Sequence, residues 1–291
     1  MTIKELPFST TIQRWCNHRR NRQQQQAAMN ALWQAGVAPE IDFWDGFIGS
    51  RGSLWPEDFE QRMDPARPLQ DHVTEILDFP VGSTIKILDV GAGPLTYLGK
   101  IWPGRTLEIT AVDPLADEYA AIFQRHQLAP PIVTQRGAAE ELVAQFGENS
   151  FDLVHARNCI DHSFDAVRAI EQMVAVAKPG GLVYMHHAVN EADTEGYHGF
   201  HQWNFHGTTE WFWVSNQAWS TNMTLRLAAV AEVTNQLFGN GEWIITKMKK
   251  HTRLPQLVRW RHVATTYHRW LWRYVTEKRI QHSDQLRMRN R

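Results

Sequence analysis

Two acidic residues stand where a nucleoside could be held, at the ends of consecutive strand-like segments. Asp89 follows the apolar run Ile85-Lys-Ile-Leu and precedes the turn Gly91-Ala92-Gly93. Asp113 ends the next apolar run, 20 residues after Gly93. Glycines let a ligand approach the backbone closely, and an acidic residue at this distance can accept hydrogen bonds from ribose hydroxyls. The spacing therefore predicts a nucleoside site.

A dinucleotide is favoured less than a single nucleoside. The pyrophosphate fingerprint requires a third glycine three residues after the second, where this chain has Thr96, and Pro94 follows Gly93 directly. The alternative for Asp113 is an N-cap of the helix expected from Ala116.

A second set of polar residues contains candidates for proton transfer. The set consists of Asp161, His162, His186, His187, Asn190, Glu191 and His201. Imidazole titrates in the range that suits a general base, so we take His162 as the first candidate and His187 and His201 as the next two. Because the chain has 14 histidines, a structural role stays open for each.

The same region has nitrogen and oxygen ligand types for a metal in Asp161, His162, His187 and Glu191. No tight ligand spacing such as His-Glu-x-x-His joins them, so no metal site is predicted. The chain has only two cysteines, which excludes a thiolate-rich cluster and a disulfide scaffold. Cys159 is expected to pack as a small hydrophobic residue.

The elements that must position these residues alternate between strands and helices. Strands are expected at 85–90, 107–112, 131–134, 151–156 and 181–186, and helices at 95–101, 116–125, 139–146 and 166–177. An insertion at 188–220 is followed by a helix at 223–231 and by two strand-like runs within 232–249, separated by Asn240-Gly241. This order predicts a doubly wound α/β sheet of seven strands, five parallel and two in a C-terminal antiparallel hairpin.

Two further regions flank or interrupt this sheet domain, residues 81–250. Residues 1–80 are predicted to form a helical cap or lid, with a helix at 11–33 stopped at Gly36 and an aromatic, turn-rich stretch from Asp42 to Pro56. The insertion is rich in aromatic residues, which could stack on sugar or planar rings or could form a satellite hydrophobic cluster. Both interpretations stay open.

The two strand ends at Asp89 and Asp113 resemble the class I S-adenosylmethionine-dependent methyltransferases. Further segments match in the right order: Gly137-Ala-Ala-Glu140, Ser150-Phe-Asp-Leu-Val-His-Ala-Arg-Asn158, and Ala177-Lys-Pro-Gly-Gly-Leu-Val-Tyr-Met-His186. The resemblance covers residues 84–249. It implies a Rossmann-like fold, S-adenosylmethionine as cofactor, and methyl transfer as the reaction.

Carried onto this chain, the resemblance implies a role for each matched position. The Gly91-Ala92-Gly93 turn would pack against the methionine part and the ribose, with Asp89 near the cofactor amino group. Asp113, with Pro114, would hold the ribose hydroxyls. Adenine would lie beside Ala139 and Glu140, although Glu140 could equally be a helix-start acid, and Asn158 would approach the methionine. Arg51 or Arg62 would pair with the cofactor carboxylate if neither pairs on the surface.

The acceptor is less defined than the cofactor. A histidine-rich and aromatic mouth favours a hydroxyl on a small or carbohydrate-like molecule. The family's Asn/Asp-Pro-Pro-aromatic signature for amino acceptors is absent, and Asn158-Cys-Ile-Asp161 stands in its place. An RNA or protein acceptor is the nearest alternative. A non-catalytic nucleotide-binding module that recruits partners is the alternative from another class.

Charge divides the chain into an acidic body and a basic tail. The 291 residues carry a net charge of −1, yet residues 247–291 carry +11 and the rest −12. Residues 251–291 are predicted to form a basic amphipathic helix, which fits an anionic membrane surface, the acidic body or a dimer mate, and fits nucleic acid less well. No signal peptide or apolar span is seen, so a cytoplasmic protein is expected, with the inner membrane face and homo-oligomerisation left open.

Overall fold

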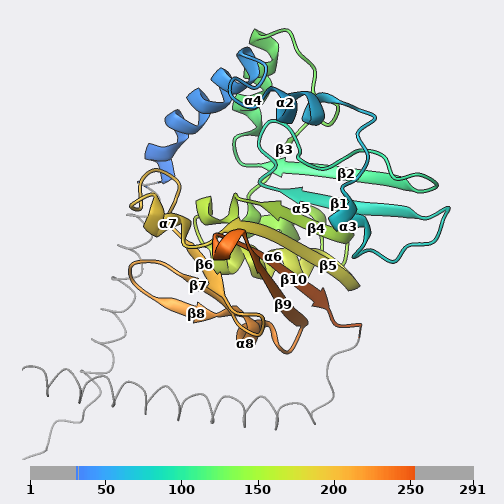
Figure 1. The fold of residues 1–291 in the computed structure, drawn as a ribbon, viewed down its shortest axis with the longest axis vertical. Coiled ribbons are helices and arrows are strands. Elements are labelled where there is room, and N and C mark those ends of the chain that lie inside the picture. The colour runs from blue at the N-terminus through green and yellow to red at the C-terminus, as the bar shows by residue number, and fades with distance from the viewer. Residues whose placement is uncertain (1–30, 32, 253–291) are drawn as a thin grey trace, which may run out of the picture.

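The computed structural model describes residue 31 and residues 33–252, which form a seven-stranded sheet in the order β3-β2-β1-β4-β5-β10-β9 (Figure 1). The strands are β1 (Thr84–Val90), β2 (Thr106–Asp113), β3 (Gln135–Arg136), β4 (Phe151–Arg157), β5 (Ala177–Ala188), β9 (Ala231–Phe238) and β10 (Trp243–Lys250). Strands β1 to β5 pair in parallel, and β10 is antiparallel to both β5 and β9. The predicted α/β Rossmann-like fold with its C-terminal hairpin is confirmed.

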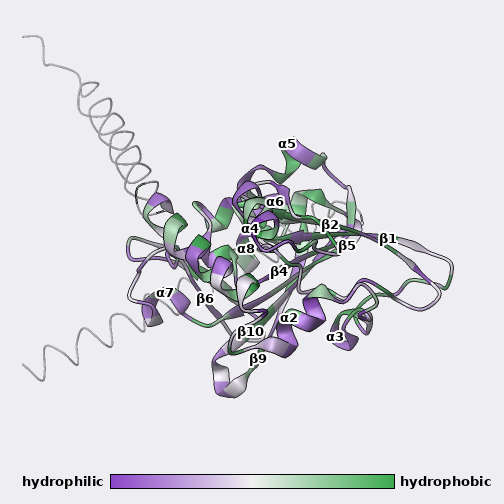
Figure 2. Cartoon of the chain, turned by 90° about the horizontal axis from the view of Figure 1, so that it is seen from above, coloured by the Kyte–Doolittle hydropathy of each residue, from purple (hydrophilic) through white to green (hydrophobic). Residues whose placement is uncertain are grey.

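Helices and short segments cover both faces of the sheet. The helices α5 (Leu142–Phe146), α6 (Ala166–Val176) and α8 (Met223–Leu227) share one hydrophobic cluster with alternate strand residues, and α3 (Asp71–Thr74) shares another with the opposite face. Figure 2 shows hydrophobic residues gathered around α6, α4 (Ala116–Arg125) and the strands, whereas α2 (Pro56–Met63), α3 and α7 (Glu191–Thr194) are mostly hydrophilic. Alternate residues of the central strands point to opposite faces of the sheet and are buried in different clusters, so the sheet is packed between two layers.

The connection from β1 to β2 contains no helix, so the helix predicted at 95–101 is wrong. Its backbone groups are bonded to residues 62–70 instead of to one another: Arg62 donates to Leu95 O, while Arg67 and Gln70 both donate to Tyr97 O. A Cβ on Gly99 would lie 1.9 Å from the carbonyl oxygen of Pro68. Side chains of the amino-terminal segment thus replace the helix as hydrogen-bond partners.

A helix at residues 33–49 differs from the predicted pattern, because it runs through Gly36 and through the first part of the stretch expected to be turn-rich, whereas residues 50–54 form turns as expected. Gly36 serves close packing here, since a Cβ at this position would lie 2.5 Å from the ring of Phe200. Phe47 and Ile48 pack with residues of α2 and α4 in one hydrophobic cluster. A lid role for residues 1–80 stays a prediction.

The insertion forms a second, three-stranded sheet of β6 (Asn204–Gly207), β7 (Phe212–Ser215) and β8 (Ser220–Asn222). Trp203, Phe205 and Phe212 are buried in the main hydrophobic cluster. The burial of these three side chains favours the interpretation of the insertion as a hydrophobic cluster over its interpretation as a stacking surface.

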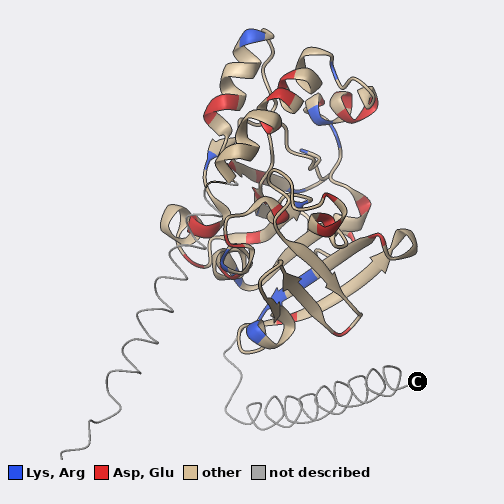
Figure 3. Cartoon of the chain, turned by 90° about the vertical axis from the view of Figure 1, so that its left-hand side faces the viewer, with Lys and Arg blue, Asp and Glu red and all other residues tan. Residues whose placement is uncertain are grey.

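Two element boundaries differ in smaller ways. The strand expected at 131–134 lies at Gln135–Arg136, and the helix expected at 139–146 is divided into η1 (Ala139–Glu141) and α5. Among the described residues, no helix has the length and apolarity needed to cross a membrane. Figure 3 shows acidic residues scattered over the helices, whereas β10 ends in Lys247, Lys249 and Lys250. The predicted helices at 11–33 and 251–291 fall almost wholly outside the described residues.

Candidate functional site

A cavity of about 530 Å³ opens at the carboxyl ends of β1, β2 and β4. This volume lies in the range of small-molecule sites. Its wall includes all nine predicted cofactor positions: Asp89, Gly91, Ala92, Gly93, Asp113, Pro114, Ala139, Glu140 and Asn158. Of the three candidate bases, only His162 lines it.

The glycine turn is shaped by close neighbours on both sides. Gly91 and Gly93 each have φ of 62°, a left-handed conformation that favours glycine. A Cβ on Gly91 would lie 2.6 Å from Cys159 Sγ, and one on Gly93 would lie 3.0 Å from the ring of Trp44. The turn therefore brings its backbone against the cavity in a way that side chains there would prevent.

Asp89 holds this turn in place. Its Oδ2 accepts a hydrogen bond from Thr96 Oγ1 at 2.5 Å, and its Oδ1 lies 2.6 Å from Nδ1 of His155. All three side chains are buried. Since each oxygen already has a protein partner, Asp89 positions the turn, and its predicted contact with a cofactor amino group stays a prediction.

Asp113 presents a carboxylate to the cavity without a positively charged partner among the described residues. Its oxygens accept hydrogen bonds from Gly93 N at 3.1 Å and Leu115 N at 2.9 Å. Burial raises the pKa of this carboxyl to about 7, although these backbone donors and Tyr119 work against the rise. Such a carboxylate gains from further neutral donors such as hydroxyl groups.

On the far side of the turn, Ala139 and Glu140 line the cavity. The carboxylate of Glu140 accepts a hydrogen bond from the Asp165 backbone at 2.9 Å, so it fastens the loop before α6. Burial raises its pKa. This contact matches the structural alternative for Glu140, while its place on the wall leaves an adenine contact open.

Asn158 and Cys159 leave β4 at the centre of the cavity wall. Asn158 has φ of 46°, and its Oδ1 accepts a hydrogen bond from Ala188 N, which joins the ends of β4 and β5. Cys159 is partly buried, and desolvation raises the pKa of its thiol. Its Sγ packs against Gly91 and contacts Val90 O at 3.1 Å, so it behaves as the expected small packing residue.

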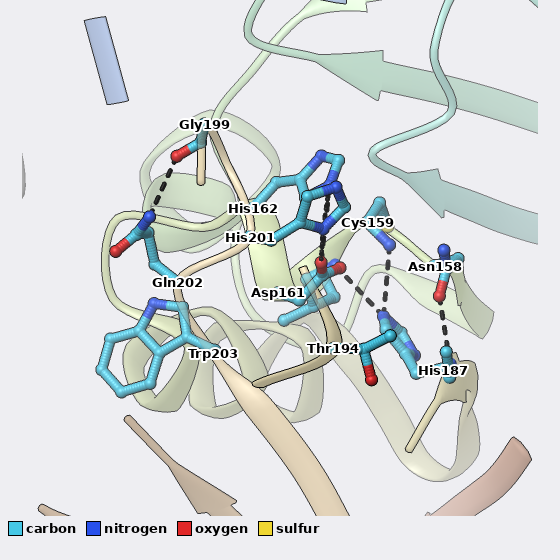
Figure 4. A network of polar contacts seen from close by, with 12 residues as sticks. Asn158, Cys159, Asp161, His162, His187, Thr194, Gly199, His201, Gln202 and Trp203 are labelled. Atoms are coloured by element: carbon cyan, nitrogen blue, oxygen red, sulfur yellow. Dashed lines mark hydrogen bonds and ion pairs between the residues drawn. The ribbon is translucent and has the colours of Figure 1, made fainter. Parts of the chain in front are cut away.

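Two of the three candidate bases meet at one carboxylate. His201 Nδ1 lies 2.8 Å and His162 Nε2 lies 3.4 Å from Oδ2 of Asp161, and the two ring nitrogens are 3.2 Å apart (Figure 4). Burial acts to raise the pKa of Asp161, but the charge of His162 and the hydrogen bond to His201 lower it overall. At His201, burial acts to lower the pKa of the imidazole. The hydrogen bond to Asp161 and the charge of Asp161 outweigh burial, so the pKa of His201 is raised overall.

His187 occupies a different position. It is buried outside the cavity wall, and its Nε2 accepts hydrogen bonds from the backbone of Cys159 at 3.3 Å and Ile160 at 3.1 Å (Figure 4). Burial lowers its pKa to about 3. A neutral ring whose acceptor nitrogen already receives two backbone hydrogen bonds favours the structural role that was left open for His187, and its role as a base stays a prediction.

Several residues on the wall were missed by the sequence analysis. They are Trp33, Gln34, Glu40, Trp44, Tyr97, Tyr119, His155, Arg157, Phe164, Phe200 and Trp243. Of the two arginines considered, Arg62 lines the cavity and Arg51 does not. Arg157 lies 3.7 Å over the ring of Tyr97. A polar residue inside an apolar strand, such as His155 in β4, was a usable signal, whereas the lining from residues 33–44 had none.

Comparisons with known proteins point to methyltransferases. Residues 88–185 match the family model described as a methyltransferase domain. The chain is 30% identical over 122 residues to the ubiquinone biosynthesis O-methyltransferase of Methylobacterium nodulans, covering 42% of this chain and 43% of that protein. It is 28% identical over 106 residues to phosphoethanolamine N-methyltransferase 2 of Caenorhabditis elegans, covering 36% of this chain and 24% of that protein.

Among solved structures, the CMeT domain of the citrinin polyketide synthase is similar, with a TM-score of 0.45 and 16% identity over 64% of this chain and 50% of that chain. The matched part of this chain spans less than half the length of these curated relatives. The match of residues 88–185 confirms the resemblance predicted from the strand ends.

Proposed function

We propose that this chain is a class I S-adenosylmethionine-dependent methyltransferase that methylates a hydroxyl group of a small or carbohydrate-like acceptor. One observation carries the proposal: a single cavity is lined both by Asp113, which suits a ribose, and by His162, which suits proton removal. Methyl transfer to a hydroxyl needs both functions within reach of one another.

The residues present fit the cofactor. Asp113 is a buried carboxylate with its remaining acceptor capacity turned to the cavity wall, and the Gly91 to Gly93 turn forms a cradle that a Cβ would fill. Asp113 would hold the ribose, Ala139 would lie by the adenine, and Arg62 and Asn158 would lie by the methionine part. When bound, S-adenosylmethionine supplies a methyl carbon on a positively charged sulfur that leaves with the electrons of the broken carbon–sulfur bond.

The chain's own residues must handle the proton that a hydroxyl acceptor loses. We assign this task to the cluster of Asp161, His162 and His201. His162 is its member on the cavity wall, and its Nε2 faces Asp161 and His201, so without a metal its other ring nitrogen, Nδ1, is the atom that would take the proton. Asp161 and His201 stand behind it, and the negative charge of Asp161 stabilises the imidazolium that forms.

The lining favours a small acceptor over a macromolecule. Aromatic side chains from separate segments, Trp33, Phe200 and Trp243 among them, face the same volume, and aromatic faces suit sugar or planar rings. The similarity to an O-methyltransferase agrees with a hydroxyl acceptor. The similarity to an N-methyltransferase keeps an amine as the second candidate atom.

A cytoplasmic location and membrane association through the basic tail remain part of the proposal. Both depend mainly on residues outside the described part of the chain. They are tested by whether removal of residues 252–291 leaves cofactor binding intact and abolishes sedimentation with anionic vesicles at low salt.

The test of the function uses S-adenosylmethionine labelled in its methyl group and a panel of monosaccharides, nucleotide sugars, phenols and amines. We expect label in a hydroxyl-bearing acceptor, and His162→Ala should lower that rate about 10²-fold or more with nearly unchanged affinity for S-adenosylhomocysteine. His198→Ala is the matched control, because His198 is exposed in the same insertion.

Other results would redirect the proposal. Label in RNA or protein but in no small molecule would overturn the acceptor class. Cofactor binding without turnover on any of these acceptors would favour the non-catalytic module. An unaltered rate in His162→Ala would remove His162 from the mechanism and make His201 the next residue to test.

A further inference from the structure

The cluster of Asp161, His162 and His201 has a geometry that its hydrogen bonds alone do not explain. Asp161 and His162 belong to η2 (Ile160–His162), directly after β4, and His201 comes from the insertion before β6. Figure 4 shows both rings directed at the carboxylate. The three facing atoms are separated by 2.8, 3.2 and 3.4 Å, and each of the three residues offers one possible ligand atom to the same point.

Two of these separations, 3.2 and 3.4 Å, are those of ligands on one face of a metal ion, and the third, 2.8 Å, is slightly shorter. Bonds of about 2.1 Å from nitrogen and oxygen ligands, at angles between about 90° and 110°, place neighbouring ligand atoms about 3.0 to 3.4 Å apart. Two imidazoles and one carboxylate are also a common ligand set for first-row divalent ions, which leaves further coordination positions open.

A proton satisfies this triangle less well than a cation does. If only His201 Nδ1 carries a proton and donates it to Asp161, His162 Nε2 must share that same N–H as its donor. If both nitrogens carry protons, the two N–H groups point at each other and repel. The second carboxylate oxygen, Asp161 Oδ1, is buried and has no hydrogen-bond partner among the residues that the structure describes. The side chain of Asp161 is 1% exposed, so an unmatched oxygen there is costly.

The surroundings supply more negative charge and an opening. Glu191, at the start of α7, interacts with the charges of Asp161 and His201 and forms a hydrogen bond with Asn158. The charge of Asp161 acts to raise the pKa of Glu191, and a cation near both carboxylates would relieve this repulsion. Because His162 lines the cavity, an acceptor molecule in the cavity could reach the unoccupied coordination positions of an ion bound here.

We propose that Asp161, His162 and His201 bind a divalent first-row transition-metal ion of the Zn²⁺ or Fe²⁺ class at the acceptor side of the cavity. Nitrogen-rich ligands select such ions over Mg²⁺ and Ca²⁺, which prefer oxygen. The catalytic consequence rests on the proposed function: an acceptor hydroxyl bound to the ion loses its proton more readily, to solvent, and its oxygen then forms the bond to the methyl carbon as the carbon–sulfur bond breaks.

The experiment uses the full chain, freed of any affinity tag and of metal by a chelator that is then removed. Titration with Co²⁺ followed by visible absorption, and with Zn²⁺ by calorimetry, should show one site per chain. His201→Ala and Asp161→Asn should each weaken Co²⁺ binding about 10²-fold or more. His198→Ala, an exposed histidine three residues away, should bind as the wild type does, and Mg²⁺ should not compete.

Metal binding and methyl transfer are read separately, so the two proposals fail in different ways. Absence of Co²⁺ and Zn²⁺ binding, or binding that both variants retain, would overturn the metal site and leave His162 as the base. Two variants are used because one could fail to fold, which circular dichroism would reveal. One bound ion without label transfer to any hydroxyl would uphold the site and overturn the proposed function. Full activity in metal-free protein would overturn the ion's catalytic part.

Discussion

Asp113 and Asp161 are two buried carboxylates on either side of the same glycine turn, and their surroundings are opposite. Asp113, at the end of β2, has backbone donors and a tyrosine, and burial raises its pKa to about 7. Asp161, after β4, is just as deeply buried, but His162 and His201 lower its pKa despite that burial. Burial alone therefore does not set the charge of an acid in this cavity, because the neighbouring groups decide it.

The difference separates the two tasks of the cavity. A carboxylate without a cation is best satisfied by neutral hydroxyl donors, which a ribose offers. A carboxylate facing two imidazoles is best satisfied by positive charge, either a proton or a metal ion. Changing each acid in turn should therefore affect different measurements.

The largest effect on stability is expected at Asp161. In the presence of a chelator at pH 6, Asp161→Ala should lower the free energy of unfolding by about 2 to 4 kcal/mol, because it leaves two facing imidazoles without their acceptor. The pKa of His201 is raised in the folded chain, so its stabilising contribution is full below the unfolded value of about 6.5 and is lost as pH rises through the folded pKa. The loss should be smaller at pH 9.

The control for this measurement is Asp117→Ala. Asp117 is a surface carboxylate paired with Arg136, and 69% of its side chain is exposed. Its removal should change unfolding by less than about 0.5 kcal/mol. Equal losses at Asp161 and Asp117 would show that the histidine cluster contributes no more than a surface pair.

Asp113 should govern cofactor affinity. Asp113→Ala should weaken binding of both S-adenosylmethionine and S-adenosylhomocysteine by about 1.5 to 3 kcal/mol, through lost charge-assisted hydrogen bonds to the ribose. Calorimetry measures this, again with Asp117→Ala as control. A wild-type chain that bound NAD and neither of these nucleosides would contradict the cofactor assignment.

The contrast between these two acids also shows what the sequence could predict. Asp89 and Asp113 were found from the sequence because strand periodicity and the two glycines place them at one sheet edge, and that edge depends only on the order of strands. The five parallel strands and the C-terminal hairpin followed from the same periodicity and from the turn at Asn240-Gly241, whereas the order of the strands in the sheet was not predicted. The cluster at Asp161 was only partly predictable, because His201 arrives from an insertion whose path depends on tertiary packing.

The missing helix after β1 has a similar cause. Residues 95–101 have an apolar pattern that suits a helix, yet Arg67 and Gln70, 30 and 27 residues away, both donate hydrogen bonds to the backbone carbonyl of Tyr97. Gly36 was taken as a helix end because glycine often is, whereas it makes room for Phe200. Local propensity cannot reveal contacts of this range.

A moderate effect is expected from pH. Since Asp113 has a pKa near 7 in the cofactor-free chain, lowering the pH from 8 to 6 protonates most of it and should weaken S-adenosylhomocysteine binding about tenfold. The sign follows from the raised pKa, because the charged form that accepts both hydroxyls is lost as pH falls. Asp113→Asn should flatten this dependence. If the pH dependence of binding persists unchanged in Asp113→Asn, a group other than Asp113 causes it.

The smallest effect should come from Tyr119, whose hydroxyl forms a hydrogen bond with Asp113. Tyr119→Phe removes one donor to the charged carboxylate, which raises the pKa of Asp113 further and moves the midpoint of cofactor binding to higher pH. Affinity should fall about threefold at pH 7 and hardly at all at pH 9. Tyr184→Phe is the matched control, because Tyr184 is buried beside His155 and belongs to the opposite hydrophobic cluster. A loss of equal size at both pH values would mean that Tyr119 acts by packing, and the difference between the two carboxylates would then depend on the backbone donors alone.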